Sequence, residues 1–368
     1  MSGSDDALRT GVREYYSQLQ STNDLRTSAC TVAARPPPSI RRLIAEVPRE
    51  ITDKFYGCGC PVSEAWRGSG MTILDLGSGS GRDAYVASAL VGARGRVIGV
   101  DMTDAQLDVA RRHASAWTAD AASDRAPLDF RCGLIEALID GDARVEKGSV
   151  DVCISNCVVN LSPDKLAVLR SVHDALKCGG EFHFSDVFCD RRLSADARKH
   201  PLLVGECIGG ALYEGDFRRM CRHVGFCDPR VLSRSAPLDL SGLDDVPEAR
   251  ALLGNARFYS VTYRLFKLSP DAGEDACEDY GQVALYKGTL PGHAHAYALD
   301  ETHSFETRRP VLVCGNTAAM ITESWLSAHF DVIGQREQHF GLFDCSGGGG
   351  GAGGGAETAQ CDTGGACC

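Results

Sequence analysis

The sequence predicts an α/β fold built on a Rossmann-like, doubly wound parallel sheet, with an appended subdomain and a small C-terminal α+β domain. Two observations support this prediction. The apolar residues 73–76 run into a glycine-rich stretch at 77–81, a helix-forming segment follows, and a second apolar run at 97–100 ends at Asp101. From about residue 67 to 190, short apolar runs alternate with helical patterns. Such alternation is typical of parallel strands connected by helices.

The glycine-rich stretch predicts a loop that binds a nucleotide cofactor. Its glycines recur as GxGxG, whereas the dinucleotide fingerprint is GxGxxG. We therefore favour S-adenosylmethionine over NAD. Asp101 follows the second strand, where a carboxylate can bind ribose hydroxyls, and Met102 beside it can pack on adenine.

Two further strands and a helix are expected after this unit. Residues 150–155 form an apolar run suited to a central strand. Ser162 and Pro163 are typical of a helix N-cap and first position, and the leucines and valines that follow recur at near-helical spacing. The pair Gly179-Gly180 predicts the end of that helix, and residues 181–186 predict the next strand.

Composition narrows the class of protein. A chain of 368 residues suggests two or three domains. Its net charge of −11 argues against nucleic acid as a partner, because phosphate contacts require a basic surface. No run of 18 apolar residues predicts a membrane span, and the first residues lack the basic and apolar regions of a secretory signal. We expect a cytoplasmic protein and a monomer, whose 17 cysteines are free thiols or transient disulfides.

We expect five segments along the chain. The N-terminal segment covers the cofactor site, and the Gly/Cys-rich tail is disordered because it cannot bury enough apolar surface to fold. In order, they are an N-terminal lid segment (1–66), the nucleotide-binding domain (67–190), a substrate-binding subdomain (191–268), a small C-terminal domain (269–345) and the tail (346–368).

Three cysteines stand where the backbone or a strand end would present them to a ligand. Cys157 follows the strand at 150–155, and ligands of open α/β sheets bind beyond the carboxyl ends of the strands. Cys58 lies between two glycines, and Cys207 is followed by a glycine pair. A buried structural thiol remains the alternative for Cys157. Zinc is disfavoured, since the chain has no CxxC pair and no HExxH motif.

Five motifs together resemble a known family. They are TSAC at 27–30 with ARP at 34–36, YGCG at 56–59, LDLGSGSGRD at 74–83, SNCVVN at 155–160 and GECIGG at 205–210. In this order the chain is similar to the arsenite S-adenosylmethionine methyltransferase family. The similarity extends through residues 258–267 to the cysteine-rich terminus, and it implies a class I methyltransferase sheet.

This resemblance implies a function and a set of thiols. The family transfers methyl groups from S-adenosylmethionine to thiol-bound trivalent arsenic, first arsenite and then methylarsenite, in arsenic detoxification. Cys58, Cys157 and Cys207 match its arsenic ligands, and Cys30 matches the remaining redox-active cysteine. Trivalent arsenic is soft and prefers thiolates, and three sulfurs leave its lone pair free to attack a methyl group. Methylation formally oxidises arsenic, so glutathione or thioredoxin is expected as co-substrate, with Cys30 and Cys58 as the candidates for the disulfide that it resets.

The same resemblance assigns Leu134, Ile135 and Glu136 to the adenine side of the cofactor, although Leu134 and Ile135 could equally be core residues. Tyr56 can place its ring on the sulfonium or can pack the N-terminal segment. The complete set of predicted cofactor-binding residues is Tyr56, Asp75, Gly77, Ser78, Gly79, Gly81, Asp101, Met102, Leu134, Ile135, Glu136 and Asn156.

Two other functions stay open at this point. A protein that sequesters or senses arsenic or a metal would explain the thiols, but it would give the glycine-rich loop and Asp101 no role. A methyltransferase of an organic small molecule would explain the loop, but it would leave Cys30, Cys58, Cys157 and Cys207 without a joint role.

Overall fold

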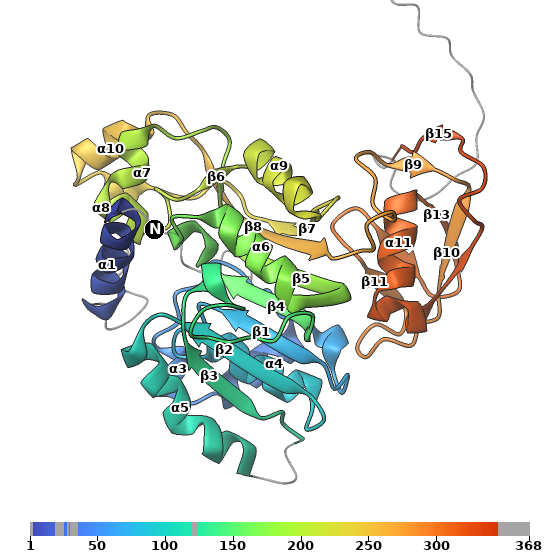
Figure 1. The fold of residues 1–368 in the computed structure, drawn as a ribbon, viewed down its shortest axis with the longest axis horizontal. Coiled ribbons are helices and arrows are strands. Elements are labelled where there is room, and N and C mark those ends of the chain that lie inside the picture. The colour runs from blue at the N-terminus through green and yellow to red at the C-terminus, as the bar shows by residue number, and fades with distance from the viewer. Residues whose placement is uncertain (1–2, 19–25, 28, 30–35, 120–123, 345–368) are drawn as a thin grey trace, which may run out of the picture.

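The structure, a computed structural model, describes residues 3–18, 26–27, 29, 36–119 and 124–344 (Figure 1). At its centre lies an eight-stranded sheet with the order β3-β2-β1-β4-β5-β8-β7, and β6 pairs with β5. Strands β1 to β5 are parallel, whereas β8 runs antiparallel to β5 and β7. The strands are β1 (Thr72–Leu76), β2 (Arg96–Asp101), β3 (Leu128–Cys132), β4 (Val150–Asn156), β5 (Leu176–Cys189), β6 (Leu212–Tyr213), β7 (Arg230–Arg234) and β8 (Phe258–Phe266).

Helices cover both faces of this sheet. Successive side chains of a strand point to opposite faces, so Ile73 packs in the core beneath α4 and α5, while Leu74 and Leu76 pack in the core beneath α6 and α9. These helices are α4 (Arg82–Val91), α5 (Asp104–Ala119), α6 (Lys165–Ala175) and α9 (Glu214–Val224). The predicted α/β, Rossmann-like fold is confirmed.

The strand order switches direction between β1 and β4, since β2 and β3 are added on the outer side of β1 and β5 on the outer side of β4. Open α/β sheets bind their ligands at such a switch point. The glycine-rich loop leaves β1 at this place, and Cys157 directly follows β4.

The helix after β4 differs from its prediction at both ends. Its N-cap is Asp164, whose side chain accepts a hydrogen bond from the backbone N–H of Ala167 at 2.9 Å, so Ser162 and Pro163 precede the helix. It ends at Ala175, and Gly179-Gly180 lie within strand β5. Leu176 pairs with Val150 on β4, so strand β5 begins at Leu176, before the two glycines. This contact between distant segments outweighs the tendency of Gly179-Gly180 to end a helix.

Smaller helices lie between the other elements of the chain. They are α1 (Gly3–Gln18), α2 (Pro38–Glu46), α3 (Arg49–Thr52), α7 (Ala195–Lys199), α8 (Pro201–Gly205), α10 (Pro247–Leu253) and the short 3-10 helices η2 (Glu64–Trp66), η3 (Ile135–Ala137), η4 (Val159–Leu161) and η5 (Ser241–Leu243). In Figure 1, α1 lies beside α8, and the two helices are in contact.

The C-terminal part has its own apolar core, formed by a three-stranded antiparallel sheet (β13-β10-β14) and helix α11. Its elements are β9 (Glu278–Asp279), β10 (Gln282–Tyr286), β11 (Ala296–Ala298), β12 (Ser304–Glu306), β13 (Pro310–Val313), α11 (Gly315–Glu323), η6 (Trp325–His329), β14 (Phe330–Ile333) and β15 (Gly341–Leu342). The predicted disordered tail, 346–368, lies outside the described residues.

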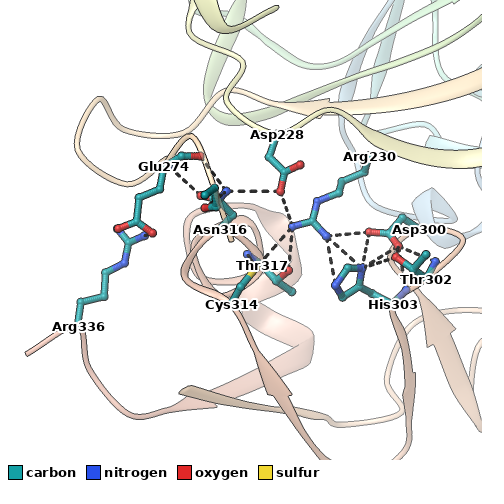
Figure 2. A network of polar contacts seen from close by, with 11 residues as sticks. Asp228, Arg230, Glu274, Asp300, Thr302, His303, Cys314, Asn316, Thr317 and Arg336 are labelled. Atoms are coloured by element: carbon teal, nitrogen blue, oxygen red, sulfur yellow. Dashed lines mark hydrogen bonds and ion pairs between the residues drawn. The ribbon is translucent and has the colours of Figure 1, made fainter. Parts of the chain in front are cut away.

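Two buried arginines of the central sheet reach into this C-terminal part. Arg264 on β8 pairs with Glu181 and donates a 2.8 Å hydrogen bond to the Tyr297 hydroxyl, while Trp325 donates to the same Glu181. Arg230 on β7 pairs with Asp300 (Figure 2).

A buried charge is costly unless it is paired. The Arg230–Asp300 ion pair and the hydrogen bonds Arg264–Tyr297 and Trp325–Glu181 link the C-terminal part to the sheet, whereas the Arg264–Glu181 pair lies within the sheet. None of the described helices combines the length and apolar character of a membrane span.

Candidate active site

A cavity of about 1050 Å³, partly open to solvent, lies at the carboxyl ends of β1, β2 and β4. Eleven of the twelve predicted cofactor-binding residues line it. They are Tyr56, Asp75, Gly77, Ser78, Gly79, Asp101, Met102, Leu134, Ile135, Glu136 and Asn156. Gly81 is the exception. It caps α4, where a Cβ atom would meet the ring of Phe130 at 2.9 Å, so this glycine allows close packing beneath the loop.

The glycine-rich loop follows β1 with three glycines at positive φ, of which Gly81, the N-cap of α4, has φ of +98°. Gly77 has φ of +61° and Gly79 has φ of +52°. A Cβ atom at Gly77 would lie 2.3 Å from the Val158 side chain, whereas one at Gly79 would meet nothing within 4 Å. Gly77 therefore lets the loop pack against the segment after β4, and Gly79 leaves space open on the side of the cavity.

Asp101 ends β2 and fixes the loop from the opposite side. Its Oδ2 accepts a 2.9 Å hydrogen bond from the backbone N–H of Gly79, and its Oδ1 accepts one from the N–H of Thr103 at 2.8 Å. Burial raises the pKa of Asp101, although these backbone N–H groups oppose the shift. Each oxygen keeps a lone pair, so the carboxylate can also accept hydrogen bonds from a ligand.

Two buried polar atoms on the cavity side find no hydrogen-bond partner among the described residues. They are the Ser78 hydroxyl oxygen and Oε1 of Gln106. Buried polar groups are normally paired, and these two can bind the hydroxyl, amino or ring nitrogen groups of a ligand. Together with the space beside Gly79 and the Asp101 carboxylate, they fit a nucleoside cofactor such as S-adenosylmethionine.

The three predicted arsenic ligands belong to one buried cluster next to this cavity. Cys58, Cys157 and Cys207 are each at most 2% exposed, and all three pack in the same apolar core. Cys157 also lines the cavity itself. The Cys207 sulfur lies 3.4 Å from the carbonyl oxygen of Cys157, so the turn after α8 meets the segment after β4 directly.

Two of these cysteines have backbone conformations that are unusual for a residue with a side chain. Cys157 has φ of +57° and Cys207 has φ of +59°. The left-handed region costs an L-residue roughly 1–2 kcal/mol, and such conformations gather at functional sites. Here the main chain itself sets the directions of both Cα–Cβ bonds.

Asn156 positions the loop that carries Cys58. Its Oδ1 accepts hydrogen bonds from the backbone N–H groups of Cys58 and Gly59, and its Nδ2 donates to the Gly59 carbonyl and to Asp83. The amide of Asn156 is thus used within the protein, although the residue lines the cavity. Its structural role is to fix Cys58 against the end of β4.

The described residues contain no group of three or more His, Cys, Asp or Glu side chains arranged as a ready metal site. The three thiols share one core, with Cys157 and Cys207 in contact through the backbone. Cys30, the fourth predicted cysteine, lies outside the described residues.

Residues of the N-terminal helix complete the site, and the sequence analysis did not identify them individually. Arg9, Val12 and Tyr16 of α1 line the cavity. The Tyr16 hydroxyl lies 3.6 Å from the Cys207 sulfur, and Arg9 forms an ion pair with Glu136. The Tyr16 ring meets the ring of Tyr56 edge-on at 5.5 Å.

Glu206 holds this N-terminal region in place and was also missed as a site residue. It is fully buried. Its Oε1 accepts hydrogen bonds from the Tyr15 hydroxyl and the N–H of Arg26, and its Oε2 accepts two from Thr27. The only sequence signal was its position directly before Cys207.

Asp186, which is buried, and Lys165, which is half-buried, interact electrostatically with Cys207. Burial raises the pKa of Asp186 to about 8, and the charge of Cys207 adds to the increase. Burial lowers the pKa of Lys165 to about 8. Ionisation of Cys207 therefore disfavours ionisation of Asp186, and the reverse also holds. A ligand that neutralises the Cys207 thiolate would favour ionisation of Asp186.

Comparisons with known proteins agree with this geometry. A methyltransferase domain model matches residues 67–225. An arsenite methyltransferase of Aquipseudomonas alcaligenes is 48% identical over 357 residues, which cover 96% of this chain and 99% of the relative. The arsenite methyltransferase of Homo sapiens is 37% identical over 332 residues, covering 89% of this chain and 84% of the relative.

A solved structure gives the same result. The crystal structure of an arsenic(III) S-adenosylmethionine methyltransferase from Chlamydomonas reinhardtii is 52% identical to this chain, with a TM-score of 0.77. The match covers 84% of this chain and 100% of that chain.

Proposed function

The chain belongs to the arsenite methyltransferase family, from which we infer that it methylates arsenite with S-adenosylmethionine. We propose that the cavity holds the cofactor and that Cys58, Cys157 and Cys207 hold the arsenic. The observation that carries this assignment is the position of Cys157, which belongs both to the cavity wall and to the buried thiol cluster.

On the cofactor side, we assign three roles to residues of the chain. Asp101 accepts hydrogen bonds from the ribose hydroxyls, and Met102 packs against the adenine ring. Tyr56, whose ring meets Tyr16 on the cavity wall, faces the sulfonium with its π-electrons. When bound, S-adenosylmethionine supplies an electrophilic methyl group on its sulfonium sulfur.

On the substrate side, the three cysteines act as sulfur ligands. Each loses its proton when it binds arsenic, and the soft As(III) ion prefers such ligands. The left-handed backbone at Cys157 and Cys207 fixes the directions of their Cα–Cβ bonds. Three sulfurs on one side leave the arsenic lone pair on the other, toward the cavity that Cys157 lines. The chain's contribution is mainly alignment, for which effective molarities allow roughly 7–11 kcal/mol.

Electron balance implies a thiol reductant. The arsenic lone pair becomes the new As–C bond, so each methylation formally oxidises arsenic and two electrons must be returned. We propose that Cys30 and Cys58 supply these electrons as they form a disulfide, which glutathione or thioredoxin then reduces. Methylarsenite would be the second substrate, and we retain the expectation of a cytosolic monomer.

Speciation of arsenic tests the proposal directly. The purified full chain is incubated with arsenite, S-adenosylmethionine, glutathione and thioredoxin, and the products are separated by chromatography with mass detection. We expect methylated arsenicals from the wild type, and none from Cys157→Ser or Cys207→Ser. Both variants should still bind S-adenosylmethionine in calorimetry.

A matched control is available in the same core. Cys189 is fully buried in the thiol cluster but is not a proposed ligand, so Cys189→Ser should retain methylation. Turnover by Cys157→Ser and Cys207→Ser would remove both residues from the mechanism. Tight binding of unchanged arsenite by the wild type would instead indicate sequestration.

A further inference from the structure

A second pair of cysteines lies in the C-terminal part, remote in sequence from the arsenic ligands. Cys314 is the N-cap of α11 and is fully buried, and Cys277 is half-buried just before β9. The side chains of the two residues are hydrogen-bonded to each other. Neither cysteine has a role in the proposed methyl transfer.

The first turn of α11 brings the two cysteines together. Asn316, two residues after Cys314, is almost fully buried, and its side chain accepts a 2.8 Å hydrogen bond from the N–H of Glu274. Its Nδ2 group donates to the carbonyl oxygens of Glu274 and Ala276. These hydrogen bonds link Ala276, the residue before Cys277, to helix α11, whose N-cap is Cys314.

The surroundings of Cys314 favour a thiolate. Its sulfur accepts a hydrogen bond from the N–H of Thr317 at 3.5 Å and lies 3.3 Å from the Thr317 hydroxyl and 3.9 Å from Nη2 of Arg230. Figure 2 shows Arg230 reaching from the central sheet toward the start of this helix. The hydrogen bond from Cys277, opposed by burial, and those from Thr317 hold the pKa of the Cys314 thiol well below its ordinary value. A helix N-terminus and a nearby cation act in the same direction in reactive cysteines.

Accessibility divides the roles between the two sulfurs. Cys277 is half-buried, so part of the residue is exposed to solvent, whereas Cys314 is fully covered. This arrangement suits a pair in which one cysteine is attacked from outside and the buried thiolate resolves the product.

We propose that Cys277 and Cys314 form a thiol–disulfide exchange site whose oxidant is a low-molecular-weight disulfide of the glutathione type. In the first step, the sulfur of Cys277 attacks the disulfide, one thiol leaves with the proton of Cys277, and a mixed disulfide forms on Cys277. In the second step, the Cys314 thiolate attacks the Cys277 sulfur and expels the second thiol as its thiolate. The two cysteines lose two electrons, and the low-molecular-weight disulfide gains them.

Oxidation of Cys277 and Cys314 would change the contacts between the central sheet and the C-terminal part. Arg230 is buried between Asp228, Asp300 and the Cys314 sulfur. A disulfide carries no charge, so Arg230 would lose one of its negative partners. The redox state of the pair is thereby coupled to the network that joins β7 to the C-terminal part.

Peptide mapping tests this inference without reference to methylation. The reduced full chain is incubated with oxidised glutathione, quenched with acid, alkylated and analysed by mass spectrometry. We expect a cross-link between Cys277 and Cys314 with the loss of two hydrogens. Cys314→Ser should stop at glutathionylated Cys277, and Cys277→Ser should leave Cys314 unmodified because it is buried.

The exposed Cys178 provides a control, since Cys178→Ser should leave the cross-link unchanged. The proposal fails if the wild type forms no Cys277–Cys314 cross-link, if Cys277 pairs with Cys227 instead, or if Cys314 is modified in the absence of Cys277. The wild-type map decides these first two points even where a variant is unstable.

Discussion

The phenol of Tyr15 donates a 2.7 Å hydrogen bond to Oε1 of Glu206, and this contact joins helix α1 to the residue that precedes Cys207. The same carboxylate also accepts hydrogen bonds from Arg26 and Thr27. One buried side chain thus holds two N-terminal segments beside the proposed arsenic site. The positions of these N-terminal segments and of Cys207 therefore both depend on Glu206.

Replacing this carboxylate should therefore loosen the N-terminal region. Glu206→Gln removes the negative charge and replaces one of the two carboxylate oxygens, which accept hydrogen bonds, with an NH2 group, which donates them. Hydrogen bonds to charged groups contribute about 1.5–3 kcal/mol each, so we expect KM for arsenite to rise about tenfold or more. Limited proteolysis should cut the N-terminal 36 residues faster.

The exposed Glu248→Gln is the control for this prediction and should behave as the wild type. If KM and proteolysis are unchanged in Glu206→Gln, then the carboxylate does not hold the lid segment.

Gly79→Ala should weaken cofactor binding while the protein stays folded. Its Cβ would enter open space beside the cavity, and its φ of +52° costs roughly 1–2 kcal/mol with a side chain present. Gly148 also has a positive φ, of +66°, and open surroundings, but it lies in the turn before β4 and does not line the cavity, so Gly148→Ala is the control for a side chain at positive φ. We expect both variants to lose similar thermal stability, and only Gly79→Ala to lose affinity for S-adenosylmethionine in calorimetry. Equal affinities would contradict the placement of the cofactor.

The contribution of His183 to the stability of the protein should decrease as the pH falls from about 7 to about 5. Burial lowers the pKa of His183, and the charge of Arg264 lowers it further, while Glu181 opposes the shift. The unfolded chain therefore takes up a proton near its ordinary pKa of about 6.5, where folded His183 remains neutral. His173 and His329 act in the same direction.

Urea unfolding at several pH values measures this effect. Relative to the wild type, His183→Gln should become more stable as the pH decreases across this range, whereas the exposed His295→Gln should keep a constant difference from the wild type. An unaltered pH dependence in His183→Gln would show that this histidine does not contribute.

Arg264→Met should destabilise the protein strongly. Glu181 is fully buried, and despite its burial, Arg264 and His183 lower the pKa of Glu181 to about 2. Removing the guanidinium leaves that carboxylate without its main partner, at a cost of about 3–5 kcal/mol. Arg96 pairs with Asp129 at the surface, so Arg96→Met should cost less than about 1 kcal/mol. Urea unfolding measures the free energy of unfolding of both variants. Equal losses in Arg264→Met and Arg96→Met would show that removing Arg264 from the buried pair costs no more than removing a surface partner.

Local patterns predicted the nucleotide-binding unit well. The apolar run before Gly77 and the acidic end of the second strand depend only on neighbouring residues, and they form β1, the loop and β2 as expected. Strand-end position and neighbouring glycines singled out Cys58, Cys157 and Cys207, but only the family resemblance joined them as one set of arsenic ligands, since no spacing rule connects segments so far apart.

Long-range contacts explain what the sequence did not predict. Tyr15 and Glu206 are 191 positions apart, and neither residue carries a signal that refers to the other. The shifted C-terminal end of α6 has the same origin, because the pairing of Leu176 with Val150 decides where the helix ends. Arg230 meets its partners in the C-terminal part across 70 or more residues of sequence.

The left-handed backbone at Cys157 and Cys207 also restricts which residues can replace them. Among residues with side chains, Asn and Asp tolerate this conformation best, and β-branched residues tolerate it least. Exchange of these two positions for oxygen ligands would keep the main chain as it is, whereas exchange for valine or isoleucine would require it to move. The main chain at both positions therefore accepts short polar side chains more readily than branched apolar ones.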